Sequence, residues 1–107
     1  MIIYSVTITI ERAFDCEWLD WMRRIHVPDV LRTGCFVEAT IYKLVEPPGD
    51  DPRYVIEYRC ASLQEYRRYR DDFAAALQKD HSDRFSGRFC AARQILEEVW
   101  SEPYSLH

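Results

Sequence analysis

The segment EWLDWMRRIHVPDVLRTGCF, residues 17–36, decides the fold of this chain, because it combines a helical pattern with the signals for a turn and a strand. In its helical part, up to His26, the polar side chains fall mainly at Glu17, Asp20, Arg23 and Arg24. The apolar arc that remains is wider than contact with one sheet face requires. We therefore expect this helix to meet a second surface, either a ligand or a partner chain.

Signals at both ends of the segment predict the limits of its helix. Asp15 is placed to cap the first turn. Pro28 disfavours helical geometry at Val27, so we expect regular helix to end near His26. Gly34 can adopt the left-handed backbone conformation that closes a further helical turn.

Four segments, near residues 4–10, 35–45, 54–59 and 89–99, have the composition of β-strands. The side chains expected to face the core are Tyr4, Val6, Ile8 and Ile10 in the first strand, Val37, Ala39 and Ile41 in the second, and Tyr54, Ile56 and Tyr58 in the third. The polar, proline-rich residues 47–52 predict a hairpin loop between the second and third strands.

A second long helix is predicted after the third strand. Ser62 and Glu65 have the spacing of a capping box at its start. Its apolar stripe contains Leu63, Tyr66, Phe73 and Leu77, with Tyr69 at the edge. We expect residues 82–87 to form a break before the last strand.

The order β-α-β-β-α-β predicts an α+β, ferredoxin-like fold: a four-stranded antiparallel sheet with two helices on one face. We expect one domain over residues 1–100 and a tail over residues 101–107. The other sheet face would carry Ser5, Thr7, Thr9, Phe36, Glu38, Thr40, Tyr42, Val55, Glu57 and Arg59. Because this face mixes apolar groups with charges of both signs, it favours a homodimer with the sheets packed together.

Composition and charge exclude some classes of protein. The chain has 107 residues, 48% hydrophobic and 30% charged, with a net charge of −4 and both signs interspersed. Such a balance argues against a nucleic-acid binder. The N-terminus alternates like a strand and lacks a basic signal-peptide region, and no apolar run reaches the roughly 20 residues that a membrane span needs. We therefore expect a cytoplasmic protein without membrane contact.

The four cysteines, at positions 16, 35, 60 and 90, form no C-x-x-C pair. In a reducing cytosol they are expected to be small buried hydrophobes, with Cys16 the most exposed.

The histidines are the main candidates for chemistry. We expect His26 beside Tyr4, Tyr58 and Tyr66, either as a helix-end group or as a proton acceptor at a pocket mouth. The antiparallel helices should place His81 at the opposite end of the sheet, near Trp18, Tyr54 and Arg84. This separation and the lack of a metal-binding spacing predict no metal site, and no motif indicates a cofactor.

Two arginine features have structural explanations. The run Tyr66-Arg-Arg-Tyr-Arg70 interleaves basic and aromatic residues, but acids four residues after Arg67 and Arg68 cancel its field. Arg93 lies among apolar residues of the last strand, where we expect it to pair with Glu57 or with an acid of a partner subunit.

Tyr4, residues 18–28, residues 33–36 and residues 81–89 together resemble the bacterial family known as DUF4286, a domain of unknown function. The resemblance covers nearly the whole chain except the tail and the loop at Pro47. It implies a ferredoxin-like dimer of the dimeric α/β-barrel type and brings no established activity.

Gly34 before the second strand and His81 with Phe85 four residues later are also similar to the antibiotic-biosynthesis monooxygenases. That group includes cofactor-free quinone-forming oxygenases and haem-degrading enzymes, which use a pocket between sheet and helices. The asparagine typical of both is absent from this chain, which contains no Asn.

The preferred hypothesis is a homodimer whose subunits bind a small, partly apolar ligand between sheet and helices. The candidate ligand-binding residues are Tyr4, Trp18, Met22, His26, Tyr58, Tyr66, His81 and Arg93. An enzyme with His26 as base, catalysing cofactor-independent oxygenation or isomerisation, is the alternative. A protein-interaction module without catalysis is the third possibility.

Overall fold

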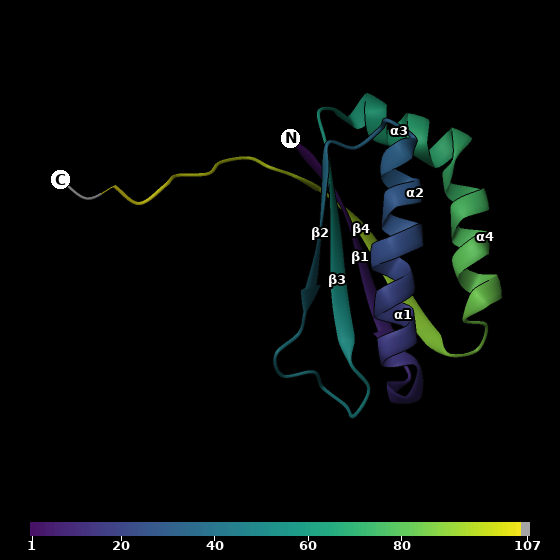
Figure 1. The fold of residues 1–107 in the computed structure, drawn as a ribbon. Helices are drawn as coiled ribbons and strands as arrows, with labels where there is room; N and C mark the ends of the chain where they lie inside the picture. Colours follow the sequence, from purple (N-terminus) through teal and green to yellow (C-terminus); the bar gives the residue numbers. More distant parts are fainter. Residues whose placement is uncertain (106–107) are drawn as a thin grey trace.

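The computed structural model describes residues 1–105 and contains a four-stranded antiparallel sheet with all helices on one face (Figure 1). The strands are β1 (Ile2–Ile10), β2 (Glu38–Lys43), β3 (Arg53–Cys60) and β4 (Phe89–Glu97). Their order is β2-β3-β1-β4, so β1 lies in the centre and pairs with both β3 and β4. The predicted ferredoxin-like α+β fold is confirmed.

Alternation along the two central strands places their side chains as predicted. Tyr4 lies opposite Tyr58 of β3 and Ile95 of β4, so all three belong to the face that the helices cover. The inward residues of both central strands are buried: Tyr4, Val6, Ile8, Ile10, Tyr54, Ile56 and Tyr58. Period-two alternation was sufficient here because one face of each strand is completely covered.

The first helical rod does not end at Pro28. It runs from α1 (Asp15–Trp21) through the π-helical segment η2 (Met22–His26) into α2 (Val27–Arg32). The N–H of Val27 bonds to the carbonyl of Met22, five residues earlier, in a widened turn. A wide turn relieves the clash between a proline ring and the preceding turn, so the helix continues past the proline.

The start of this rod also differs from the prediction. A short 3₁₀ segment, η1 (Arg12–Phe14), precedes α1, and no side chain caps the helix. Asp15 is the first residue of α1, and its Oδ1 accepts a hydrogen bond of 2.6 Å from the hydroxyl of Tyr54. The carboxylate therefore ties the helix to β3 instead of capping it.

The predicted second helix is two helices, α3 (Leu63–Asp72) and α4 (Ala74–Arg84), which meet at Phe73. Ser62 caps α3 as expected, since its Oγ accepts the N–H of Glu65 at 3.3 Å. Tyr66, Phe73 and Leu77 of the predicted stripe are partly buried against the core. Leu63 is 39% exposed, whereas Tyr69 is buried in the core.

The predicted faces of Phe36 and Val37, which lie in the turn after α2, are wrong. Phe36 is buried and packs on Tyr4 and Tyr58 with ring centroids 6.1 and 5.3 Å away, and Val37 is 68% exposed. Strand β2 begins only at Glu38, so neither residue follows the strand alternation. From Ala39 onward the predicted faces are correct.

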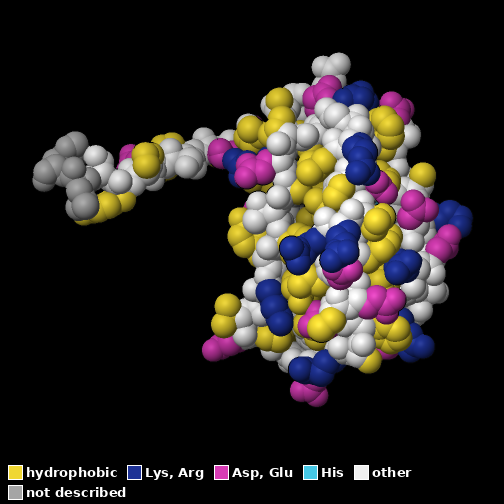
Figure 2. Space-filling view, in the orientation of Figure 1, with side chains coloured by type: hydrophobic (Ala, Val, Ile, Leu, Met, Phe, Trp, Pro, Cys, Tyr) yellow, Lys and Arg dark blue, Asp and Glu magenta, His cyan; other side chains and the backbone are white. Residues whose placement is uncertain are grey.

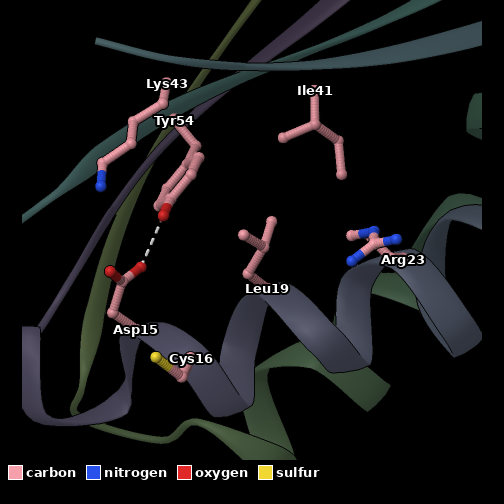
Figure 3. A pocket seen from close by; sticks show the side chains of 7 residues that line it. All are labelled: Asp15, Cys16, Leu19, Arg23, Ile41, Lys43 and Tyr54. Atoms are coloured by element: carbon pink, nitrogen blue, oxygen red, sulfur yellow. Dashed lines mark hydrogen bonds between the residues drawn. The ribbon is translucent and has the colours of Figure 1, made fainter. Parts of the chain in front are cut away.

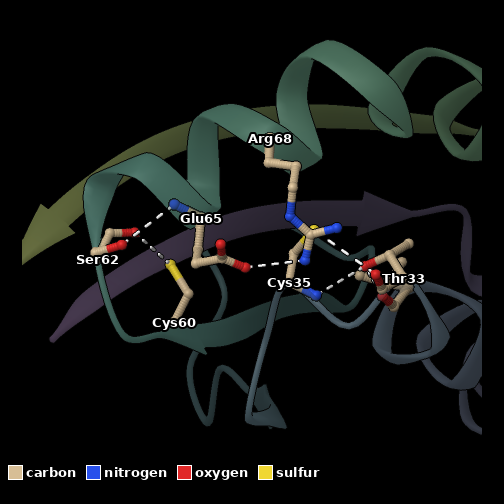
Figure 4. A network of polar contacts seen from close by, with 7 residues as sticks. Thr33, Cys35, Cys60, Ser62, Glu65 and Arg68 are labelled. Atoms are coloured by element: carbon tan, nitrogen blue, oxygen red, sulfur yellow. Dashed lines mark hydrogen bonds and ion pairs between the residues drawn. The ribbon is translucent and has the colours of Figure 1, made fainter.

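This turn lies beside the start of α3, and hydrogen bonds within the turn fix its conformation (Figure 4). Gly34 has φ +78°, the predicted left-handed conformation. The Thr33 hydroxyl donates to the carbonyl of Val30 at 2.7 Å and accepts the N–H of Cys35 at 3.3 Å. On the facing helix, Arg68 pairs with Glu65 at 2.9 Å, not with the acid four residues further on.

The face of the sheet away from the helices carries the mixed set of side chains that was predicted, apart from Phe36. Cys90 also faces outward, opposite Thr9, and is exposed, contrary to the expectation of burial. Cys16 is exposed and Cys35 and Cys60 are buried, as expected. Figure 2 shows the opposite charges interspersed on the visible surface, with the chain after β4 leading away from it. Within residues 1–105, none of the helices has the length and hydropathy to cross a bilayer.

Candidate functional site

A small cavity lies between the centre of the sheet and the helices. It has a volume of about 30 Å³, enough for a water molecule or two. Its lining consists of Tyr4, Val6, Ile8, Met22, His26, Ile56, Tyr58, Tyr69, Gln78, His81 and Arg93. Two imidazoles, three phenols, one amide and one guanidinium therefore border a cavity whose other lining residues are apolar.

The two histidines lie side by side in this cavity, with ring centroids 5.6 Å apart. The prediction that they lie at opposite ends of the sheet is wrong. Since the helix continues through Pro28, His26 occupies the middle of the first rod, next to the last turn of α4, which carries His81. The extra helical length brings the two residues together.

His81 is neutral and held in one tautomer. Its Nε2 accepts a hydrogen bond of 2.9 Å from the indole N–H of Trp18, and the side chain is 6% exposed. Burial, together with the charges of His26 and Arg93, lowers the pKa of His81 to about 4. A neutral imidazole carries one proton, so the proton of His81 resides on Nδ1. The predicted proximity to Trp18 is confirmed.

His26 is also neutral near pH 7 but is not held by a hydrogen bond to any residue of the described chain. Its ring stacks on Trp21 with a centroid distance of 5.1 Å. Burial lowers the pKa of His26, which the nearby carboxylates of Asp29 and Asp80 partly oppose. An unprotonated imidazole without a fixed donor is available to accept a proton.

His26 lines a second space as well. A groove of about 430 Å³ between the first rod and α4 is bordered by Trp21, Ile25, His26, Asp29, Asp80, Asp83 and Arg84. His26 therefore lies between the inner cavity and an outer groove bordered by three carboxylates, of which Asp29 pairs with Arg32 and Asp83 with Lys79.

Tyr4 is the centre of an aromatic cluster. Its ring centroid lies 5.7 Å from Tyr58, 5.5 Å from Tyr66 and 5.7 Å from Tyr69. Burial raises the pKa of Tyr4, while hydrogen bonds to Arg93 and Gln78 oppose that rise. Its hydroxyl is thus protonated near neutral pH and engaged by two polar side chains.

Arg93 faces the cavity and not the open side of the sheet. It lies opposite Val6 on β1, whereas Glu57 lies opposite Ser5 and faces the other way. The expected pair with Glu57 is therefore impossible, because the two side chains lie on different faces of the sheet. Among residues 1–105, no carboxylate forms an ion pair with Arg93.

The predicted residues converge only in part. The cavity is lined by both histidines and by Tyr4, Met22, Tyr58 and Arg93. Trp18 does not line it but donates a hydrogen bond to His81. Tyr66 contacts Tyr4 without reaching the cavity. The prediction missed Tyr69 and Gln78. Gln78 precedes His81 by three positions on α4, a spacing that places both on one side of a helix.

The described residues contain no group of three or more His, Cys, Asp or Glu side chains arranged to hold a metal ion.

The fold is shared with proteins of known structure. The cofactor-independent oxygenase SnoaB from Streptomyces nogalater aligns with a TM-score of 0.71 and 14% identity over 96% of this chain and 97% of its own. A dimeric ferredoxin-like protein from an uncultured marine organism aligns with a TM-score of 0.69 and 13% identity over 97% and 100%. A Nitrosomonas europaea protein described as an antibiotic biosynthesis monooxygenase aligns with a TM-score of 0.67 and 11% identity over 94% and 100%.

At these identities the likeness concerns the fold. No curated protein sequence matches this chain. The family profile described as Domain of unknown function (DUF4286) matches residues 1–99, which confirms the resemblance seen in the sequence. The chain therefore belongs to the DUF4286 family.

Proposed function

We propose that the central cavity binds a small conjugated molecule with a weakly acidic oxygen, such as a phenol or an enol, and that His26 accepts its proton. The observation that carries this proposal is the guanidinium of Arg93, which faces two neutral imidazoles without a paired carboxylate in the described chain. Arg93 is itself exposed, but a guanidinium that borders the cavity without a paired carboxylate favours an anion there, and an oxyanion formed in the cavity would be held by it.

The two sides of His26 suggest the protonation state in which the ligand enters. In the outer groove Asp29 pairs with Arg32 and Asp83 pairs with Lys79, so Asp80 is the carboxylate without an ion pair among residues 1–105, and its charge disfavours the approach of an anion. A neutral acid meets no such barrier and can lose its proton once it reaches His26. Because the closed cavity holds only about 30 Å³, the helices must separate, or the Arg93 side chain must move, to admit a ring.

The aromatic lining supports a flat ligand. The rings of Tyr4, Tyr58 and Tyr69 offer apolar faces, and the Nδ1 proton of His81 supplies a fixed donor. The catalytic form of this proposal is cofactor-independent oxygenation, in which the bound anion reacts with dioxygen, or isomerisation, in which the proton returns to another atom. The fold likeness to a cofactor-independent oxygenase supports the first.

The test is a titration with 4-nitrophenol, whose phenolate absorbs at longer wavelength than the neutral phenol. At a pH about one unit below its solution pKa, we expect the bound probe to show the phenolate spectrum. His26→Gln should bind the neutral form, and Arg93→Gln should lose the phenolate signal. Arg67→Gln is the matched control, because Arg67 is exposed on α3 and lines neither the cavity nor the outer groove.

An unchanged phenolate signal in His26→Gln would refute the role of His26. Failure of any phenol or enol to bind would refute the proposal as a whole. Oxygen consumption with the bound anion distinguishes oxygenation from isomerisation.

We also infer a homodimer in which the outward sheet faces pack together. The support is the mixed face that includes Thr7, Tyr42 and Val55, together with the dimeric ferredoxin-like protein of the same fold. Light scattering should give twice the chain mass of 12.8 kDa. Thr7→Lys should shift the protein to monomer, whereas Gln64→Lys, on the exposed side of α3, should not. A monomer for the wild-type protein at micromolar concentration would overturn the inference.

A further inference from the structure

A large open pocket of the described chain lies away from the central cavity. It is a groove of about 660 Å³ between the first helical rod and the edge strand β2 (Figure 3). Its lining consists of Asp15, Cys16, Leu19, Arg23, Ile41, Lys43 and Tyr54. None of these residues lines the central cavity, so the groove is a separate site. Its volume is in the range of small-molecule sites.

The middle of the groove is apolar. Leu19 projects from α1 toward Ile41 of β2, and the ring of Tyr54 extends the apolar surface toward one end (Figure 3). Both aliphatic side chains are only partly buried although they pack against the core. Covering such apolar surface with a ligand removes it from water, which favours binding.

The charges differ between the two ends. At the end near Tyr54, Asp15 accepts the tyrosine hydroxyl at 2.6 Å, and Lys43 lies 5.8 Å from the centroid of the same ring. One negative and one positive charge therefore balance there. Arg23 stands at the other end (Figure 3), and no carboxylate of residues 1–105 pairs with it.

We propose that this groove binds an amphipathic monocarboxylate of the medium-chain fatty-acid class, with its carboxylate on Arg23 and its apolar chain across Leu19 and Ile41 toward Tyr54. A guanidinium matches a carboxylate with two parallel hydrogen bonds, which a single ammonium cannot do. Because the charges of Asp15 and Lys43 balance at the end near Tyr54, a ligand with a second anionic group is not favoured there. This proposal is independent of the proposed chemistry at His26.

Cys16 provides a direct readout, because its exposed thiol lines the groove. Octanoate should slow the alkylation of Cys16 and leave the alkylation rate of Cys90, on the outward face of β4, unchanged. Octan-1-ol has the same chain without charge, and octylammonium carries the opposite charge. Both should protect Cys16 at least about tenfold less well than octanoate, the difference expected from one charge-assisted hydrogen-bonded pair.

Arg23→Gln should weaken the protection by octanoate about tenfold and leave that by octan-1-ol unchanged. Arg24→Gln is the matched control, since the neighbouring Arg24 pairs with Asp20 at 2.9 Å and does not line the groove. Unfolding curves for both variants should match the wild type, because both side chains are exposed.

Equal protection by octanoate and octan-1-ol would overturn the proposal, as would an Arg23→Gln variant that behaves like wild type. Binding of octanoate without protection of Cys16 would place the ligand elsewhere and also refute it. If Cys16 is protected without ligand and more strongly at higher protein concentration, a second copy of the chain covers the groove and the proposal is wrong.

Discussion

The indole N–H of Trp18 donates a hydrogen bond of 2.9 Å to Nε2 of His81, and both side chains are buried. This bond joins α1 to α4 across the core. It also determines which nitrogen of His81 carries the proton, because the acceptor must be the unprotonated one. Packing and site chemistry therefore depend on the same contact.

Acidification should destabilise the protein partly through His81. Its pKa is about 4 in the folded state and about 6.5 in the unfolded state, so the unfolded state binds more protons between these values. The free energy of unfolding should fall as the pH drops through this window, by on the order of 3 kcal/mol at its lower end. His26 contributes in the same direction, because burial also lowers its pKa.

The measurement is denaturant unfolding at several pH values between 7 and 4. His81→Gln retains an acceptor for Trp18 but does not titrate, so its stability should depend less on pH. Because carboxylates titrate in both proteins, the difference between the two slopes is the quantity to compare. Identical slopes would contradict the low pKa of His81.

Trp18→Phe should lower the free energy of unfolding by about 2 kcal/mol or more, because it leaves Nε2 of His81 without a donor and removes part of a buried ring. The pKa of His81 should rise in this variant, since Nε2 becomes free to take a proton. Proton NMR of the imidazole ring measures that change. Trp100→Phe, at a position that is 78% exposed, should change neither property.

Gly34→Ala should destabilise the fold by about 1 kcal/mol, because φ +78° is strained for a residue with a Cβ atom. Space is not the cause: the nearest atom to such a Cβ is Nη2 of Arg68, at 3.9 Å. Gly49→Ala tests the same change in the loop between β2 and β3, without positive φ or a neighbour within 4 Å. Thermal unfolding should show a lower midpoint for the first variant only.

Tyr54→Phe should lower the free energy of unfolding by about 1–2 kcal/mol, because it removes the hydrogen bond to the charged Asp15 that joins α1 to β3. Tyr104→Phe removes a hydroxyl from a tyrosine that is 87% exposed in the segment after β4 and should be neutral. Chemical denaturation of the two variants gives the comparison. Equal stability would show that water replaces the lost partner of Asp15 without cost.

The inward rows of the central strands, the cap at Ser62 and the left-handed Gly34 were predictable, because each follows from local chemistry: alternation on a covered sheet face, a hydroxyl at a helix start, and a residue without a Cβ. Phe36 and Leu63 were misplaced because both lie next to the end of an element, where the regular period no longer applies. The family could also be recognised from dispersed residues along the chain.

The meeting of His26 with His81 depended on packing between distant segments. Pro28 is a local signal for a helix end, but the π-helical turn before it let the rod continue and cover the sheet. The position of the Arg93 side chain depended in the same way on tertiary structure, because the register between β4 and β1 sets the face of the sheet on which this side chain lies. Local residue preferences act over a few positions. The contact between His26 and His81 and the face that Arg93 occupies are set instead by the packing of whole helices and strands, whose stabilisation exceeds the cost of one unfavourable residue such as Pro28.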